Sequence, residues 1–266
     1  MAYLMFDIHY HLLYGLDDGP KTIEGSVELA EASIAEGVTH IVCTPHANDT
    51  YTFDRELSRQ RIEEINDIVG GRLSLGLGCD FHLSPKNIED LYRDSSKYTI
   101  NGKQYLLVEF PDYGISPTIS GDFYLMIASG VVPIITHPER NRTLALSSGR
   151  LDEWVHQGCL VQITAGSLMG RFGKNAESMS HRLLKQDSVH FISSDAHSLG
   201  GRPPALAQAH RIVTDRYGQE TADRLCIHNP RAAFFGENLL PQPAPKTPKD
   251  EGRRSKWNFF GLLRGR

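Results

Sequence analysis

The chain has 266 residues, of which 40% are hydrophobic and 23% are charged, a composition typical of a globular protein with a sizeable core. Residues 241–266 carry seven Lys or Arg and two Asp or Glu, giving +5, so the net charge of −4 leaves −9 on residues 1–240. An acidic body of this kind argues against general nucleic-acid binding. The first residues do not resemble a signal peptide, and no apolar run approaches the ~18 residues of a transmembrane helix.

Short apolar strands alternate with amphipathic helices along the chain. Residues 6–11 form the first predicted strand, and Thr22 can cap a helix that ends at Gly37. Another helix begins at Asp54 and stops at Gly70. Further strands are predicted at residues 39–44, 73–79, 105–108, 131–136, 159–163 and 189–193. Further helices are predicted at residues 85–93, 122–129, 151–156, 175–185, 204–217 and 220–225.

Seven strands that alternate with helices predict a parallel sheet built from right-handed βαβ units. Such a sheet can stay open or close into a barrel. Six of the seven strands end in His, Asp or Glu, and only closure brings all of these ends to one place. The sequence therefore predicts an α/β barrel with its chemistry at the carboxyl ends of the strands.

The four cysteines show neither Cys-x-x-Cys spacing nor the density of a disulfide-stapled domain, which indicates reduced thiols in the cytoplasm. None of them has an arginine six positions later, and Cys226 with Arg231 is one residue short. This spacing argues against a cysteine-dependent tyrosine phosphatase.

The end of the first strand carries a candidate metal site. His9 and His11 lie two positions apart, so on a strand they point to the same face, and the following loop brings Asp18 to the same end. Imidazole and carboxylate together suit Zn, Fe or Mn. Taken alone, a His-x-His pair is more often a surface or core feature.

The same residue types recur at the ends of later strands. The full set is His9, His11, Asp18, His46, Asp80, Glu109, His137, Asp195 and His197. Each has an ordinary structural alternative, such as a helix cap for Asp195 or a turn position for His46. Five imidazoles and four carboxylates exceed what one ion can use, so together they predict two or three divalent metals.

The charge of this set indicates the substrate. Three divalent ions and four carboxylates leave about two positive charges, which match a dianionic phosphate monoester, and clustered metals activate water for attack on phosphorus. Arg140 follows His137 by three residues and is placed to clamp a phosphate, and Arg202 is a second candidate. The alternative for Arg140 is a surface charge beside Glu139.

Four short motifs resemble the polymerase-and-histidinol-phosphatase (PHP) superfamily. They are His-Tyr-His at 9–11, Pro-His at 45–46, His-Pro-Glu-Arg at 137–140 and Ser-Asp-Ala-His at 194–197. More narrowly, Gly-Leu-Asp-Asp-Gly at 15–19, Thr-Pro-His at 44–46 and Arg-Pro-Pro at 202–204 resemble the capsule-type (CpsB/CapC-like) bacterial manganese-dependent protein-tyrosine phosphatases. The resemblance covers residues 5–236.

This resemblance implies a distorted (β/α)7 barrel with a three-metal site, most simply Mn²⁺. It also implies action on phosphotyrosine of membrane-associated tyrosine autokinases that control polysaccharide export. The ligand sets that it implies are Asp18, His46 and His197 for one ion, His9, His11 and Asp195 for another, and Glu109 and His137 for the third. Arg140 and Arg202 would bind phosphate.

One position departs from the family pattern. The family usually bridges two metals with a glutamate on strand three, where this chain has Asp80. Aspartate is one methylene shorter, so this change puts the occupancy of one metal in question.

A tyrosine leaving group, with a pKa near ~10, needs little help from a general acid, and His197 and Asp18 are the candidates for proton handling.

The C-terminal part differs in composition from the body. We expect a barrel over residues 1–240, a proline-rich linker over 241–252 and a basic, aromatic tail over 253–266. The tail fits the headgroup region of an anionic membrane, which would place a cytoplasmic enzyme at the inner face of the membrane. The alternative is a disordered soluble tail or a partner-docking peptide.

Two rival functions stay open from the sequence. One is a small-molecule phosphatase of the same superfamily, such as one for histidinol phosphate. The other is a non-catalytic docking scaffold that works through its tail. The full ligand set and Arg140 argue against the scaffold, because a scaffold needs neither.

Overall fold

The computed structural model describes residues 4–111, 114–146 and 148–246. The predicted tail, residues 253–266, and the linker residues 247–252 lie outside this part of the chain. Among the described residues no helix is both long and apolar enough to cross a membrane.

The described residues form nine short strands, and every pairing between them is parallel. They are β1 (Met5–Tyr10), β2 (Val38–Cys43), β3 (His46–Ala47), β4 (Ser74–Leu77), β5 (Asp80–His82), β6 (Tyr105–Glu109), β7 (Val132–Thr136), β8 (Leu160–Thr164) and β9 (Phe191–Ser193). One sheet has the order β1-β2-β4, and the other has the order β3-β5-β6-β7-β8-β9.

Two of the seven predicted strands are interrupted in the structure. The second strand continues past Pro45 as β3, and the third divides into β4 and β5 at Gly78. Backbone hydrogen bonds carry the pairing across both breaks, because Gly78 N donates to Cys43 O at 2.9 Å and Asp80 N to Pro45 O at 3.2 Å. Proline cannot donate to a ladder, which explains the first break. Seven strand positions therefore remain.

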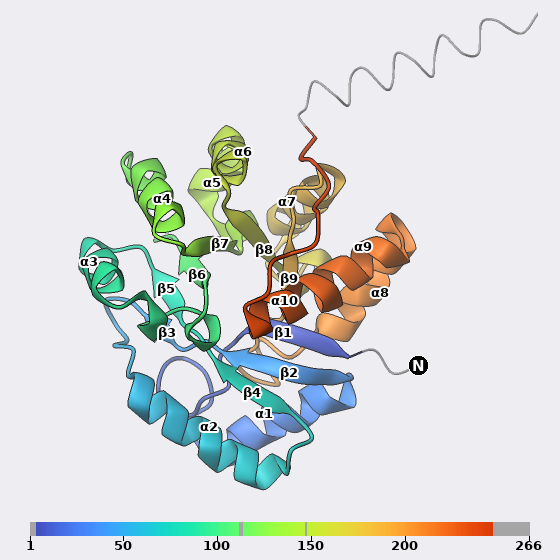
Figure 1. Cartoon of the computed structure of the whole chain (residues 1–266). Coiled ribbons are helices and arrows are strands. Elements are labelled where there is room, and N and C mark those ends of the chain that lie inside the picture. Colours follow the sequence, from blue (N-terminus) through green and yellow to red (C-terminus); the bar gives the residue numbers. More distant parts are fainter. Residues whose placement is uncertain (1–3, 112–113, 147, 247–266) are drawn as a thin grey trace, which may run out of the picture.

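The first strand lies beside the segment that follows the last strand. His11 N donates to Ala196 O, and Asp195 N donates to His9 O, both at 3.0 Å. The carboxylate of Asp7 accepts the N–H of Ser194 at 3.1 Å. These bonds join the two sheets around a common centre (Figure 1), so the predicted distorted (β/α)7 barrel is confirmed.

Helices cover the outside of the strands (Figure 1). They are α1 (Ile23–Ala35), α2 (Arg55–Val69), α3 (Pro85–Arg93), α4 (Ile119–Ala128), α5 (Arg142–Leu146), α6 (Ser148–Gln157), α7 (Lys174–Lys185), α8 (Leu206–Tyr217), α9 (Gln219–Asp223) and α10 (Asn229–Phe235). The predicted caps are present, since Thr22 accepts from Gly25 N and Asp54 from Leu57 N. Gly70 ends α2 with a φ of 63°, a left-handed conformation that glycine adopts without strain.

The barrel interior is apolar below the strand ends. Ile8, Val42, Leu107, Ile134 and Phe191 are fully buried and belong to one cluster. Ala233 of α10 joins the same cluster, so α10 closes the amino-terminal end of the barrel. The ligand candidates lie at the opposite, carboxyl end of the strands.

The start of the predicted linker lies against the barrel. Gln242 exchanges hydrogen bonds with Asn229 of α10. Lys246 N donates to Gln186 O at 2.8 Å, and the Lys246 side chain forms an ion pair with Asp187. The chain is thus held to the end of α7 as far as Lys246.

Candidate metal centre

All nine predicted ligands lie at the carboxyl ends of the strands. His9 belongs to β1, His46 to β3, Asp80 to β5 and Glu109 to β6, whereas His11, Asp18, His137, Asp195 and His197 lie in the segments directly after β1, β7 and β9. The side chains of eight of them are at most one fifth exposed, and Asp18 is the exception at 41%. The fold therefore brings residues nearly 190 positions apart to one place.

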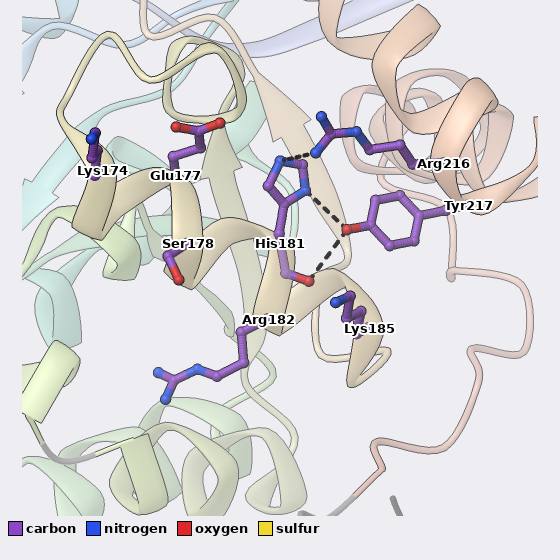
Figure 2. Close-up of a pocket in the computed structure, with 8 residues that line it drawn as sticks. All are labelled: Lys174, Glu177, Ser178, His181, Arg182, Lys185, Arg216 and Tyr217. Atoms are coloured by element: carbon purple, nitrogen blue, oxygen red, sulfur yellow. Dashed lines mark hydrogen bonds between the residues drawn. The ribbon is translucent and has the colours of Figure 1, made fainter. Parts of the chain in front are cut away.

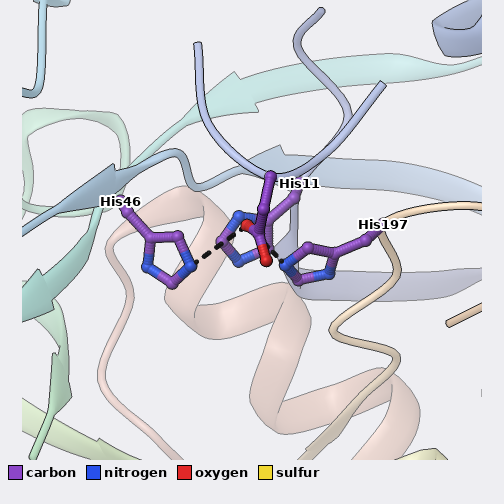
Figure 3. Close-up of side chains that lie close together, drawn as sticks. His11, His46 and His197 are labelled. Atoms are coloured by element: carbon purple, nitrogen blue, oxygen red, sulfur yellow. Dashed lines mark ion pairs between the residues drawn. The ribbon is translucent and has the colours of Figure 1, made fainter. Parts of the chain in front are cut away.

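One group consists of His11, Asp18, His46 and His197, which each offer a ligand atom within 4.8 Å of the others. Asp18 Oδ1 lies 3.4 Å from His46 Nε2 and 3.2 Å from His197 Nε2. Figure 3 shows the imidazoles of His11, His46 and His197 turned toward one another. Three imidazoles and one carboxylate can complete a tetrahedral site.

Two further groups meet at Asp80. His9, His11 and Asp80 form one, and His46, Asp80 and Glu109 form the other. Asp80 is thus shared between them, the arrangement expected of a bridging carboxylate, although it is shorter than glutamate. His11 belongs to two of the groups, whereas the resemblance implied one ion for it.

His137 and Asp195 lie at the edge of these groups. His137 Nε2 is 3.6 Å from Glu109 Oε1, and Asp195 Oδ1 is 3.5 Å from the Nε2 atoms of both His9 and His11. Both residues have a positive φ, 33° for His137 and 50° for Asp195. Such conformations are uncommon for residues with a side chain and are found at functional sites, where the surroundings enforce them.

The buried carboxylate of Asp80 indicates whether these residues are suited to a cation. Neither of its oxygens accepts a hydrogen bond from the described residues. Its nearest imidazole nitrogens are His46 Nδ1 at 3.2 Å and His9 Nε2 at 3.5 Å. A buried carboxylate without hydrogen bonds is costly, and a divalent cation removes that cost. The donor set therefore fits divalent metal ions.

The cluster shifts the pKa values of its own members in both directions. Burial disfavours protonated His9, but Asp80 and Asp195 outweigh burial and raise its pKa to about 9. Burial and the charge of Asp80 raise the pKa of Glu109 to about 7. Burial and neighbouring His197 lower the pKa of His11 to about 4. Such opposed shifts are typical of functional sites rather than of structural cores.

Two residues orient the first histidines. Asp17 Oδ2 lies 2.6 Å from His11 Nδ1, and Gln162 Oε1 lies 2.9 Å from His9 Nδ1. Each contact places the ring proton on Nδ1 and leaves Nε2 facing the cluster, as for histidines that bind metals. Asp17 also accepts the backbone N–H of His46 at 3.2 Å, so it positions a second ligand.

The sequence marks these two residues to different degrees. Asp17 stands beside Asp18 in the Gly-Leu-Asp-Asp-Gly motif at 15–19, so its place near the site is visible there. Gln162 lies in the middle of β8 and is fully buried, and no local motif marks it. Its role depends on the packing of β8 opposite β1.

Both predicted phosphate-binding arginines reach the cluster. Arg140 donates to Asp195 Oδ2, and its guanidinium lies 4.4 Å from the centroid of the Phe172 ring. Arg202 donates to Asp18 Oδ2 at 2.7 Å and approaches Asp195 Oδ2 at 3.4 Å. Two guanidinium groups beside a set of metal ligands form a site suited to the oxygens of a phosphate.

Comparison with known proteins agrees with this geometry. Residues 5–234 match the sequence profile of the family described as capsular polysaccharide synthesis, CpsB/CapC. The CapC protein of Staphylococcus aureus is 35% identical over 97% of this chain and 100% of its own length. The tyrosine-protein phosphatase YwqE of Bacillus subtilis is 30% identical over 96% of this chain and 100% of its own length.

A solved structure is similar over most of the chain. It comes from a crystallographic study of YwqE from Bacillus subtilis and CpsB from Streptococcus pneumoniae, which are described as metal-dependent tyrosine phosphatases. The TM-score is 0.85 at 30% identity, covering 91% of this chain and 100% of that one. A histidinol phosphate phosphatase from Lactococcus lactis, with a TM-score of 0.52 at 13% identity over 82% of this chain and 93% of its own, shares the fold alone.

Proposed function

The chain belongs to the CpsB/CapC family, and we propose that it is a metal-dependent protein-tyrosine phosphatase. The observation that carries this proposal is the convergence of five imidazoles and four carboxylates beside two arginines. The similar solved structure, which covers 91% of this chain, belongs to proteins described as metal-dependent tyrosine phosphatases, and this supports the same activity here.

The proposed ligands would hold two or three divalent ions. They are His9, His11, Asp18, His46, Asp80, Glu109, His137, Asp195 and His197. Mn²⁺ is the proposed metal, because a mixed set of imidazoles and carboxylates accepts it readily, and Fe and Zn are alternatives that the same donors would bind. When bound, such ions polarise a phosphoryl oxygen and activate a water molecule as the nucleophile.

The arginines have the proposed task of binding the substrate phosphate. Each now shares the Asp195 carboxylate and retains further N–H groups for phosphate oxygens. Their two positions, one after β7 and one after β9, would hold the phosphate from two sides. This fixes the phosphorus atom relative to the ligands, so the arginines contribute positioning as well as charge.

His197 and Asp18 are the proposed groups for moving protons. His197 Nδ1 lies 2.9 Å from the carbonyl oxygen of Asp195, which places the ring proton on Nδ1. Its Nε2 then faces Asp18 Oδ1 at 3.2 Å. Because a tyrosine phenolate leaves readily, these groups would act on the attacking water more than on the leaving group.

The proposed substrate is a phosphotyrosine protein, in particular a membrane-associated tyrosine autokinase that controls capsular or exopolysaccharide synthesis. The family description, capsular polysaccharide synthesis, supports this link. We propose a cytoplasmic enzyme in which the barrel of residues 1–240 is the catalytic unit. Residues 253–266 would hold it peripherally at the inner face of the membrane, because basic residues flank aromatic ones there.

Hydrolysis of a phosphotyrosine peptide by metal-stripped protein, with Mn²⁺ added back, tests the proposed activity. We expect activity to return with the metal and to fall roughly 100-fold or more in His137→Ala and Arg140→Ala, as for other groups that stabilise developing charge. His156→Ala and Arg59→Ala are matched controls, because both side chains lie on exposed parts of outer helices.

Other outcomes point to other functions. Turnover of histidinol phosphate without turnover of the peptide would replace the proposal with a small-molecule phosphatase. Failure on both substrates in metal-loaded protein would favour a non-catalytic scaffold. Equal loss in the control variants would mean that the two site variants act through folding rather than through the site.

A further inference from the structure

A groove of about 810 Å³ lies between α7 and α8 on the outside of the barrel (Figure 2). Four cations line it, which are Lys174, Arg182, Lys185 and Arg216. Among its described lining residues, Glu177 is the one carboxylate. This α7–α8 groove is thus strongly cationic, although residues 1–240 together carry a charge of −9.

A hydrogen-bond network holds the groove in shape. Arg216 Nη1 donates to His181 Nε2 at 2.8 Å, and the Nδ1 of His181 lies 2.9 Å from the hydroxyl of Tyr217. Because arginine can only donate, His181 is neutral and carries its proton on Nδ1. The network joins α7 to α8 and positions Arg216 through a neutral partner, so the guanidinium keeps its full charge.

The cations of the groove are not tied up in close ion pairs. Within the described part of the chain, none of the four forms an ion pair with a carboxylate. The carboxylate of Glu177 is turned toward the loop before α7, since a Cβ on Gly170 would lie 3.1 Å from its Oε2. Like charges held close together repel, and an anion bound among them relieves this repulsion.

The last described residue, Lys246, lies beside this groove. Lys246 is bound to Gln186 and Asp187, the two residues that directly follow Lys185 at the end of α7. The next twenty residues carry six Lys or Arg and two Asp or Glu, together with Trp257 and two phenylalanines. A basic, aromatic segment therefore starts next to a basic groove.

We propose that the α7–α8 groove binds the phosphates of anionic lipid headgroups. This proposal deepens, and rests on, the peripheral membrane location proposed above. A membrane is favoured over an acidic peptide because it accounts for the cations and the adjoining aromatic residues together. Contact along the side of the barrel leaves the carboxyl ends of the strands open to a phosphotyrosine chain.

Sedimentation of the full chain with phosphatidylcholine vesicles, with and without phosphatidylserine, tests the proposal. We expect binding that requires phosphatidylserine and weakens at high salt. The double variant Lys185→Gln/Arg216→Gln should bind roughly ten- to thirtyfold more weakly, because each cation near an anionic surface contributes to binding. Lys174→Gln/Lys185→Gln removes two exposed lysines without touching the His181 network and should act similarly.

The charge-matched control is Arg59→Gln/Lys86→Gln, which removes two exposed cations from α2 and α3. It should bind as the unaltered protein does. Thermal unfolding should be unchanged in Lys174→Gln/Lys185→Gln and in the control. Hydrolysis of p-nitrophenyl phosphate should be unchanged in every variant, which shows that the phosphatase site is intact.

Three results would overturn the proposal. Loss of binding in Arg253→Gln/Arg254→Gln but not in either groove variant would leave the peripheral location standing and reject the groove. Absence of vesicle binding by the unaltered protein would reject both. A raised KM for an acidic phosphotyrosine peptide in the groove variants, with normal vesicle binding, would make the groove a peptide site instead.

Discussion

Each end of the barrel contains a stacked pair of rings, one of which comes from β1 or the residues directly after it. The surroundings of the two pairs differ, because one is apolar and the other is charged. At the amino-terminal end, Phe6 stacks on His40 with ring centroids 4.0 Å apart. At the carboxyl end, His11 stacks on His197 with centroids 3.8 Å apart. Phe234 packs edge-on against the first pair, whereas carboxylates surround the second.

The difference shows that the neighbours, not the ring geometry, decide what a histidine does. Burial lowers the pKa of His40, which therefore behaves as a neutral aromatic ring. Burial also lowers the pKa of His11, but the Nε2 of this ring faces the other ligand candidates. Next to it, Asp80 and Asp195 raise the pKa of His9 despite its complete burial. One end of the barrel thus stabilises the fold, and the other holds the polar groups that we propose bind metal and phosphate.

Replacement of Phe6 should give the largest effect on stability. The ring is 2% exposed and packs against His40, Phe234 and Phe235, so Phe6→Ala removes most of the aromatic packing at this end. We expect a loss of about 3–5 kcal/mol in the free energy of unfolding, measured by urea denaturation. Turnover per folded molecule should stay unchanged, and a selective fall in kcat would contradict the separation of the two ends.

Asp17→Asn should act at the other end, on metal affinity. The amide cannot stabilise the Nδ1–H of His11 as the carboxylate does. We expect metal affinity to fall roughly 10- to 100-fold, measured by titration calorimetry of metal-stripped protein with Mn²⁺. Asp54→Asn is the matched control, because asparagine caps a helix as well as aspartate. Equal affinity in both variants would remove Asp17 from the site.

His190 should make stability depend on pH at the amino-terminal end. Its Nδ1 accepts the N–H of Val161, and burial, with the nearby charge of Arg224, lowers its pKa to about 4. The unfolded chain, with an ordinary pKa of 6.5, binds more protons between these values. The stabilisation is therefore complete above pH 6.5 and is lost as the pH falls toward 4.

Between pH 7 and pH 5 this loss amounts to about 2 kcal/mol. Urea denaturation of the unaltered protein and of His190→Gln at both pH values measures it. The variant lacks the titrating ring, so its free energy of unfolding should fall by about 2 kcal/mol less than that of the unaltered protein between pH 7 and pH 5. Parallel pH curves for the two proteins would show that His190 is not the responsible group.

Phe172→Leu should give the smallest effect. The ring packs against the Arg140 guanidinium, and its Cε2 would lie 3.0 Å from a Cβ on Gly166. A cation–π contact at a half-exposed site contributes about 0.5–1 kcal/mol, so KM for a phosphotyrosine peptide should rise roughly two- to fivefold. Phe172→Tyr should keep the unaltered KM. A change in kcat alone would argue for a different role.

The local pattern of the sequence was sufficient to predict which residues gather at the carboxyl ends of the strands. Alternation along a strand placed His9 and His11 on one face, and the recurrence of His, Asp and Glu after later strands predicted that all of them would meet. Helix caps such as Asp54 and stops such as Gly70 were equally visible, because they depend on residues within one turn. The motifs also indicated the family.

Other features are decided only by the tertiary structure. No pattern in the sequence indicated α10, which closes the amino-terminal end through Ala233, because the contacts of this helix form only against the barrel interior. Gln162 meets His9 across 153 positions, and Arg216 meets His181 across 35. Such contacts depend on strand register and helix packing, which no short stretch of residues encodes. The orientation of the metal ligands and the α7–α8 groove therefore emerge only when the barrel is assembled.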